Sequence, residues 1–185
     1  MSIKKLLFGL LFLILSQNCI SQNTENSNKK TDLNVTYENV DYFFKVSIPI
    51  DWKIYREIKN DTLRKSAFID WGIPKIYSEI ENAEIENSVS IKAFNSESIK
   101  NVQDLIKNEY LRIDPTTTAL EAEKGIGENA RIIYHDAPNG IKYKGKSYFK
   151  YQNGLSYIIT FMATPGTYNK NLEMFEQFYL TLTLE

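Results

Sequence analysis

Two Asn-Gly dipeptides, Asn139-Gly140 and Asn153-Gly154, constrain the fold of this chain more than any other feature. They separate three runs of alternating polar and apolar residues between Gly127 and Thr164. A type I′ turn needs positive φ at both of its central residues, and asparagine followed by glycine tolerates this conformation best. Alternation with period two is typical of strands. The segment therefore predicts an antiparallel meander of three strands.

Period-two alternation also predicts strands upstream of the meander. These expected strands cover residues 33–37, 42–48, 66–71 and 89–93. The acidic stretch from Ile73 to Asn87 lies between the last two of them and shows only weak patterning. This stretch predicts a long loop.

Helical spacing of apolar residues predicts two helices. The first runs from Asn101 to about Ile113, with Asn101 as the N-cap, because an asparagine side chain accepts a hydrogen bond from a free backbone N–H of the first turn. The second follows Pro165-Gly166. Its apolar side consists of Tyr168, Leu172, Phe175 and Tyr179. The predicted fold class is α+β: an antiparallel sheet with a C-terminal three-strand meander, flanked by two main helices.

The first 21 residues predict a cleaved signal peptide. Two lysines precede the apolar run Leu6 to Leu15, which is too short to span a bilayer because a spanning helix needs about 20 residues. Cleavage after Ser21 leaves Gln22 as the new N-terminus, so we expect a secreted or periplasmic protein. The alternative is a bacterial lipoprotein in which Cys19 is lipidated and holds the protein to the cell envelope.

Residues 22–32 contain no apolar side chain and predict a flexible polar tether to a single domain, residues 33–185. Removal of residues 1–21 takes away two lysines and no acid, so the net charge moves from −1 to −3. This charge argues against nucleic-acid binding, which needs a basic surface. Cys19 is the only cysteine, so we expect no disulfide and no cysteine metal site in the domain. No motif points to a cofactor.

The stretch Phe44 to Trp52 resembles the PsbP-like fold family, in which an alternating strand is followed by a proline and, a few residues later, a tryptophan. Here these residues are Pro49 and Trp52, and Asp51 stands where members often have glycine. The resemblance covers roughly residues 37–185. It implies an antiparallel sheet flanked by helices.

Members of the PsbP-like family have mostly accessory and binding roles. They include an extrinsic subunit of photosystem II, a Ran-binding regulator of nuclear import, and bacterial envelope proteins and lipoproteins. The family has no shared catalytic residue set, so the resemblance assigns no catalytic residue to this chain. It implies an exported, non-catalytic accessory or binding protein of the bacterial envelope, with an envelope protein or a small ligand as its partner.

His135 is the only histidine in the chain, and it adjoins Asp136. A histidine beside a carboxylate suggests a general base and the group that orients it. Neighbours in a strand, however, point to opposite faces of the sheet, which separates the two side chains. We therefore expect His135 to be a surface or hairpin-end residue. The alternative is a small exported hydrolase with a non-standard site near His135.

Alternation places four lysines on one face of the middle meander strand: Lys142, Lys144, Lys146 and Lys150. Together they form a possible partner surface for an acidic protein or for anionic lipid headgroups. The favoured interpretation is a solvent-facing or edge strand, whose lysines prevent unwanted strand pairing.

Three further features predict structure rather than chemistry. The predicted acidic loop carries four glutamates: Glu79, Glu81, Glu84 and Glu86. Carboxylates are Ca²⁺ ligands, but this cluster lacks the spacing and the turn glycine of a calcium loop, which favours a solvated loop. The segment Gly125-Ile126-Gly127 is too short to cradle a phosphate and predicts a turn. Trp52 and Trp71 are expected in the core or covering the sheet.

Overall fold

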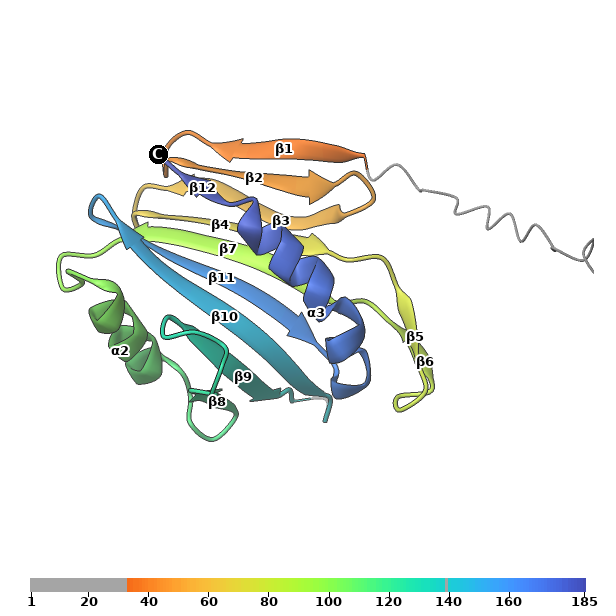
Figure 1. Ribbon diagram of the computed structural model, residues 1–185. Coiled ribbons are helices and arrows are strands. Elements are labelled where there is room, and N and C mark those ends of the chain that lie inside the picture. The colour runs from red at the N-terminus through yellow and green to blue at the C-terminus, as the bar shows by residue number, and fades with distance from the viewer. Residues whose placement is uncertain (1–32, 139) are drawn as a thin grey trace, which may run out of the picture. The chain divides into compact units, whose positions relative to one another are not determined.

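The computed structural model describes residues 33–138 and 140–185 (Figure 1). The predictions of a signal peptide over residues 1–21, of cleavage between Ser21 and Gln22, of lipidation at Cys19 and of a tether over residues 22–32 lie outside the described residues. Asn139 also lies outside them. In the described part of the chain, no helix is both long enough and apolar enough to cross a membrane.

A sheet of seven antiparallel strands forms the centre of the domain, in the order β3-β4-β7-β11-β10-β9-β8. Its strands are β3 (Lys53–Asp61), β4 (Ser66–Gly72), β7 (Ser88–Asn95), β8 (Thr118–Glu121), β9 (Ala130–Asp136), β10 (Lys142–Gln152) and β11 (Leu155–Ala163). A three-stranded sheet consists of β1 (Asn34–Asn39), β2 (Phe44–Pro49) and β12 (Thr183–Leu184). A small hairpin consists of β5 (Ile76–Ser78) and β6 (Ala83–Ile85).

The predicted meander is formed by β9, β10 and β11. Asn153 and Gly154 have φ angles of 51° and 81°, as a type I′ turn requires. Gly140, which precedes β10, also has a positive φ of 81°. The meander predicted from the Asn-Gly dipeptides is confirmed.

Two helices flank the central sheet: α2 (Val102–Arg112) and α3 (Pro165–Leu180). Asn101 caps α2, because its Oδ1 accepts a hydrogen bond of 2.8 Å from the backbone N–H of Asp104. Pro165 occupies the first turn of α3, where its missing N–H costs nothing. Both helices and the α+β fold class agree with the sequence prediction.

The alternation of β11 separates two hydrophobic cores, because successive residues point to opposite faces of the sheet. Tyr157, Ile159 and Phe161 pack into the larger core with α3 and β2, on what we call the α3 face. Ile158 packs with Phe149 beneath α2, on what we call the α2 face. Figure 1 shows α3 lying across the sheet on the α3 face.

Several short or exposed elements were not predicted. The expected loop from Ile73 to Asn87 contains the β5–β6 hairpin, whose strands have three residues each. Strand β3 lies at the edge of the sheet, and most of its residues are exposed, so it lacks an alternating apolar face. Strands β8 and β12, with four and two residues, are too short for a periodic signal.

Candidate functional site

The lysines of β10 share one face of the strand, as predicted, but most of that face packs against α3 and only its end at Lys142 is exposed. Strand β10 lies between β11 and β9, so the expected edge strand is not found. Lys146 is only 7% exposed, and its Nζ lies 2.6 Å from Glu176 Oε1 of α3. Lys142 is exposed at the strand end, 3.9 Å from Asp136. The four lysines therefore do not form one open surface.

Aromatic rings cover the remaining lysines of this face. Lys144 Nζ lies 4.5 Å from the ring centroid of Tyr168, and Lys150 Nζ lies 4.9 Å from that of Tyr179. Tyr148 donates a hydrogen bond of 2.5 Å to Glu176 Oε2. Burial, followed by this hydrogen bond, raises the pKa of Tyr148 well above its usual range. These contacts hold α3 against β10.

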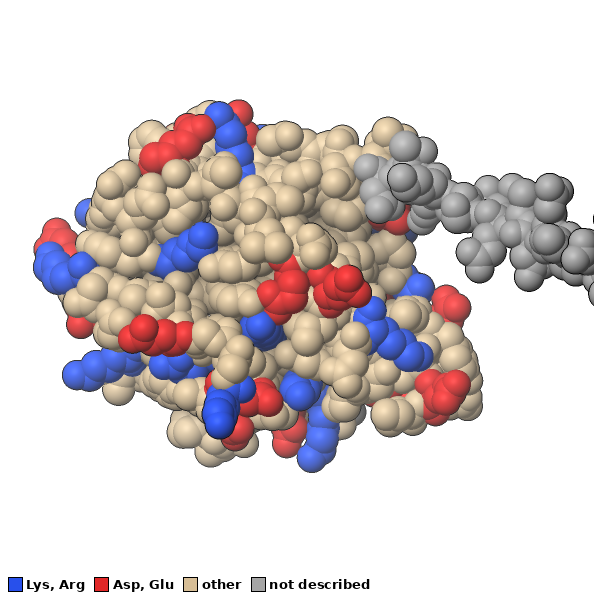
Figure 2. Space-filling view, in the orientation of Figure 1, with Lys and Arg blue, Asp and Glu red and all other residues tan. Residues whose placement is uncertain are grey.

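Charged side chains on the visible surface do not gather by sign. On the face shown in Figure 2, acidic and basic side chains are scattered among uncharged atoms, and neither sign forms a continuous field. This view offers no broad basic area of the kind that nucleic acids bind.

The environment of His135 differs from that of an oriented general base. Its Nδ1 lies 2.9 Å from Thr118 Oγ1, and its ring stacks on Tyr143 at a centroid distance of 6.3 Å. Asp136 instead lies near Lys142, as expected for adjacent residues on opposite faces. Among the described residues no carboxylate is hydrogen-bonded to the imidazole. The ring lacks the third group that a nucleophile and base pair requires.

The remaining candidate residues have structural contacts. Glu81 accepts hydrogen bonds from the Ser78 hydroxyl and, at 3.3 Å, from the backbone N–H of Gly166, which joins the β5–β6 hairpin to α3. Within residues 33–138 and 140–185, no three His, Cys, Asp or Glu side chains converge as metal ligands. Gly125 and Gly127 have positive φ and form a turn before β9. Trp52 and Trp71 are buried in the larger core.

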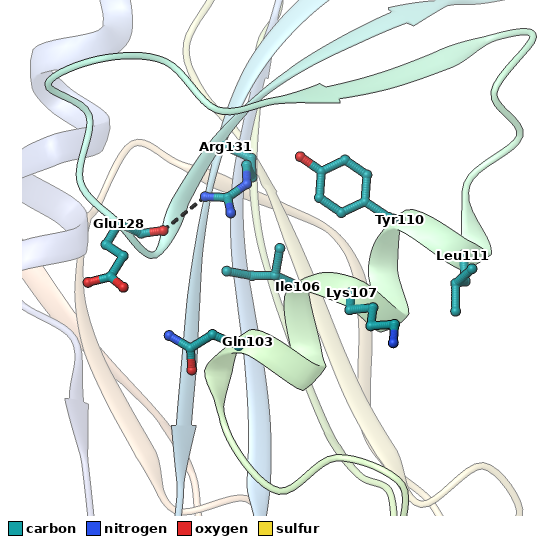
Figure 3. Close-up of a pocket in the computed structure, with 7 residues that line it drawn as sticks. All are labelled: Gln103, Ile106, Lys107, Tyr110, Leu111, Glu128 and Arg131. Atoms are coloured by element: carbon teal, nitrogen blue, oxygen red, sulfur yellow. Dashed lines mark hydrogen bonds between the residues drawn. The ribbon is translucent and has the colours of Figure 1, made fainter.

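The best candidate site is a pocket of about 330 Å³ between α2 and the start of β9. Figure 3 shows Tyr110 and Ile106 projecting from α2 toward the space below Arg131, which reaches toward Glu128. The pocket is lined by Gln103, Ile106, Lys107, Tyr110, Leu111, Glu128 and Arg131. Its wall combines charged groups with an apolar helix side.

Arg131 is the main polar group of this pocket. One terminal nitrogen donates to the backbone carbonyls of Glu128 and Ala130, at 2.9 and 2.6 Å, which holds the guanidinium against the loop. Its Nε–H is buried and has no hydrogen-bond partner in the described part of the chain. Leaving a buried donor unpaired costs about 1–3 kcal/mol. A ligand or a partner with an acceptor group would relieve this cost.

Apolar side chains on the outer surface of α2 adjoin the pocket. Leu111 is 77% exposed and Tyr110 is 40% exposed, whereas Ile106 is buried in the smaller core. The sequence pattern places Tyr110 on the helix but carries no signal for Arg131. The two residues line the same pocket, but the segment that contains β8 separates them along the chain. No local motif predicts that they lie close together.

A row of polar residues crosses the α2 face beside this pocket. Cross-strand pairs link Asp70 to Ser90, Ser90 to Thr160, Thr160 to Ser147 and Ser147 to Arg131. The hydroxyl oxygens of Ser147 and Thr160 are 2.6 Å apart. Burial raises the pKa of Asp70, while a Ser88 hydrogen bond and Arg56 oppose that effect. This face therefore carries polar groups where the α3 face carries aromatic rings.

Further pockets also border α2. One of about 500 Å³ lies at its N-terminal end, beside Asn101, Gln152 and Tyr179. Another of about 550 Å³ lies at its C-terminal end, beside Arg112. Pockets thus border α2 on several sides, and the one at its N-terminal end also reaches Tyr179 of α3.

No protein-family model and no curated protein sequence matches the chain. Among solved structures, it is similar to PA94, a protein of unknown function from Pseudomonas aeruginosa, with a TM-score of 0.53 and 14% identity over 82% of this chain and 97% of that one. It also aligns with the cyanobacterial PsbP (CyanoP) of Synechocystis sp. PCC 6803, with a TM-score of 0.48 and 12% identity over 83% and 94% of the two chains.

A Bacteroides thetaiotaomicron protein aligns with a TM-score of 0.45 and 16% identity, and the alignment covers 81% of this chain. It covers 48% of that protein, so this chain spans about half of its length. At such identities these likenesses concern the fold alone. A PsbP protein is among these neighbours.

Proposed function

We propose that this protein is an exported, non-catalytic accessory or binding protein of the bacterial cell envelope, and that it engages its partner or ligand at the α2 face. The pocket between α2 and β9 carries the proposal, because it offers Arg131 Nε–H as a buried, unpaired donor. Exposed Leu111 and Tyr110 beside it supply apolar contact area. A few placed polar groups in a largely apolar wall are typical of binding pockets.

A non-catalytic role agrees with the surroundings of His135. The one observation that favours the alternative hydrolase is the distance of 2.9 Å between Thr118 Oγ1 and His135 Nδ1. A hydroxyl nucleophile also needs its base to be oriented by a third group. In the described residues that group is missing, so we favour binding over hydrolysis.

Export is tested by the intact mass of the mature protein isolated from the bacterium that makes it. A chain that begins at Gln22 supports a free secreted or periplasmic protein. A diacylated chain that begins at Cys19 supports the lipid-anchored alternative, and a chain that retains Met1 and is found in the cytoplasm contradicts export.

Binding is tested by affinity capture from envelope extract with the mature protein and two variants, Leu111→Asp and Leu180→Asp. The two leucines are a matched pair on α2 and α3, with exposures of 77% and 73%. We expect Leu111→Asp to lose the proteins or small molecules that copurify with the wild type, and Leu180→Asp to keep them. Identical recovery with all three proteins would count against the α2 face.

A further inference from the structure

A second pocket on the α2 face carries an excess of positive charge. It has a volume of about 550 Å³ and lies among β3, β4, β7 and the C-terminal end of α2. Its basic side chains are Arg56, Arg64, Lys92 and Arg112. Asp61 is the one acidic residue of the lining, so four positive and one negative side chains leave a local charge of +3. The whole chain has a net charge of −1.

Asp61 does not neutralise this excess. Its carboxylate accepts hydrogen bonds from the backbone N–H groups of Leu63 and Arg64, at 3.1 and 3.0 Å. It also lies 3.8 Å from Arg64 Nε. For Arg56, Lys92 and Arg112, no carboxylate of the described residues lies within the 4.0 Å of an ion pair. These three cations thus form no ion pair, although Asp70 acts electrostatically on Arg56 and Glu109 on Lys92.

Two phenyl rings form an apolar floor beneath these cations. Arg56 Cζ lies 5.6 Å from the ring centroid of Phe68, and Lys92 Nζ lies 5.1 Å from that of Phe94. Phe68 and Lys92 are cross-strand partners of β4 and β7, so the sheet fixes their spacing. Cation–π contacts hold the cations in position but leave their charge available.

The position of Lys92 is unfavourable for a free ammonium group. Burial lowers its pKa, the charge of Arg112 lowers it further, and Glu109 opposes both effects. Half-burial of a cation beside a second cation costs free energy unless an anion compensates. A bound anion would supply this compensation.

We infer that this pocket binds a phosphate monoester, with the phosphate between Lys92, Arg112 and Arg56 and the apolar body of the ligand on Phe68 and Phe94. Guanidinium groups match phosphate oxygens as bidentate donors. A phosphate dianion compensates more of this positive charge than a carboxylate does. The volume suits a small organic ligand, whose usual pockets measure about 300–1,000 Å³. The inference does not depend on the pocket beside Arg131.

The test is isothermal titration calorimetry of the mature full chain with phenyl phosphate. Benzoate and phenol, which carry the same ring with less charge or none, serve as comparison ligands. We expect phenyl phosphate to bind about tenfold more tightly than benzoate, because a phosphate dianion makes more charge-assisted hydrogen bonds than a carboxylate. Phenol, which carries no charge, should not bind. Lys92→Met and Arg112→Gln should each weaken phenyl phosphate by about tenfold. Lys170→Met, which removes an exposed charge from α3 outside the described pockets, should leave the affinity for phenyl phosphate unchanged.

Thermal melting verifies that each variant is folded, and exposed Arg112 provides a second variant if Lys92→Met fails to fold. Equal affinity of wild type and both variants would overturn the inference, as would benzoate binding as tightly as phenyl phosphate, or no binding by the folded wild type.

The source of the phosphate is resolved with phosphatidylcholine vesicles that contain or lack phosphatidic acid. Retention on phosphatidic acid vesicles, reversed by phenyl phosphate, identifies a lipid headgroup. Binding of phenyl phosphate without retention on vesicles identifies a soluble ester. Lys92→Met, which should lose phenyl phosphate, should still capture the partner of the wild type from envelope extract, so failure of the partner-capture experiment and failure of this one are distinguishable.

Discussion

The helices that cover the two faces of the central sheet differ in how many of their side chains they bury. On the α3 face, Phe175 and Phe178 of α3 are at most 3% exposed and join a continuous aromatic core. On the α2 face, α2 buries only Leu105 and Ile106 and is bordered by pockets at both ends and along one side. Aromatic packing dominates the α3 face, whereas pockets border α2 on several sides.

The faces also differ in how they treat buried cations. Lys146 on the α3 face has Glu176 at 2.6 Å and the ring of Tyr148 at 4.7 Å. Lys92 on the α2 face has the ring of Phe94 but no carboxylate in ion-pair distance within the described residues. Lys146 is therefore compensated by an ion pair within the fold, whereas Lys92 forms no ion pair, as the proposed binding of an anion requires.

The largest effect is expected from Phe175→Ala, in the core of the α3 face. Phe175 is fully buried and stacks on Phe161 at 5.4 Å. Truncation of such a residue should lower the free energy of unfolding by about 3–5 kcal/mol, measured by urea denaturation. Leu111→Ala, on the exposed side of α2, should change it by less than about 0.5 kcal/mol. A similar decrease in the free energy of unfolding in both variants would contradict the difference between the two faces.

Glu176→Gln should have the next largest effect. It removes the counter-charge of Lys146, whose side chain is 9% exposed, and should cost about 2–3 kcal/mol in the free energy of unfolding. Glu173→Gln, one turn away and exposed, is the matched control and should be nearly neutral. The double variant Lys146→Met/Glu176→Leu should recover stability, since an apolar pair leaves no buried charge. Absence of this recovery would show that the ion pair itself stabilises the fold, and that Glu176→Gln does not act only by leaving Lys146 uncompensated.

His135→Ala tests the alternative of a hydrolase. Loss of the hydrogen bond to Thr118 should lower the free energy of unfolding by about 1 kcal/mol. The non-catalytic account predicts no accompanying loss of hydrolysis against a panel of ester and phosphoester substrates. An activity that is present in the wild type and abolished in a folded His135→Ala protein would establish the alternative.

The smallest effect concerns pH and Lys92. Its pKa is lowered from the ordinary 10.5 in the folded state, so between the two values the unfolded chain binds more protons and stability rises with pH. The unfavourable contribution of Lys92 is therefore full at neutral pH and disappears as pH approaches 10.5. Lys92→Met should be more stable than wild type at neutral pH, and urea denaturation should show this gap narrowing toward pH 10.5. A constant or widening gap would contradict the expected burial cost.

Sequence reasoning predicts the elements with strong local signals. The Asn153-Gly154 turn, the Asn101 cap and the helical spacing in α3 are all short-range features, and the structure contains each of them. The covered face of β10 was not predictable in this way. Alternation shows that its lysines share a face, but only the position of Glu176, 30 residues away, reveals that the face is buried.

The candidate pockets depend on contacts that no local pattern encodes. Arg131 lines a pocket with residues of α2, although the segment that contains β8 separates them in the chain. Arg112 lines a pocket with Lys92 of β7. The sequence predicts the position of α2 along the chain but not how the helix lies on the sheet. Strand β3, which supplies Arg56, lies at an exposed edge and lacks alternation. Both binding proposals therefore require the three-dimensional structure.

The most direct test of the account uses site-specific photo-crosslinking in the bacterium that makes the protein. A photoreactive residue replaces Leu111 of α2 in one strain and Leu180 of α3 in another, two leucines of nearly equal exposure. The account predicts a discrete crosslinked adduct from position 111 and none from position 180. An adduct at position 180 alone, or equal labelling at both positions, would contradict the claim that the α2 face is the binding face.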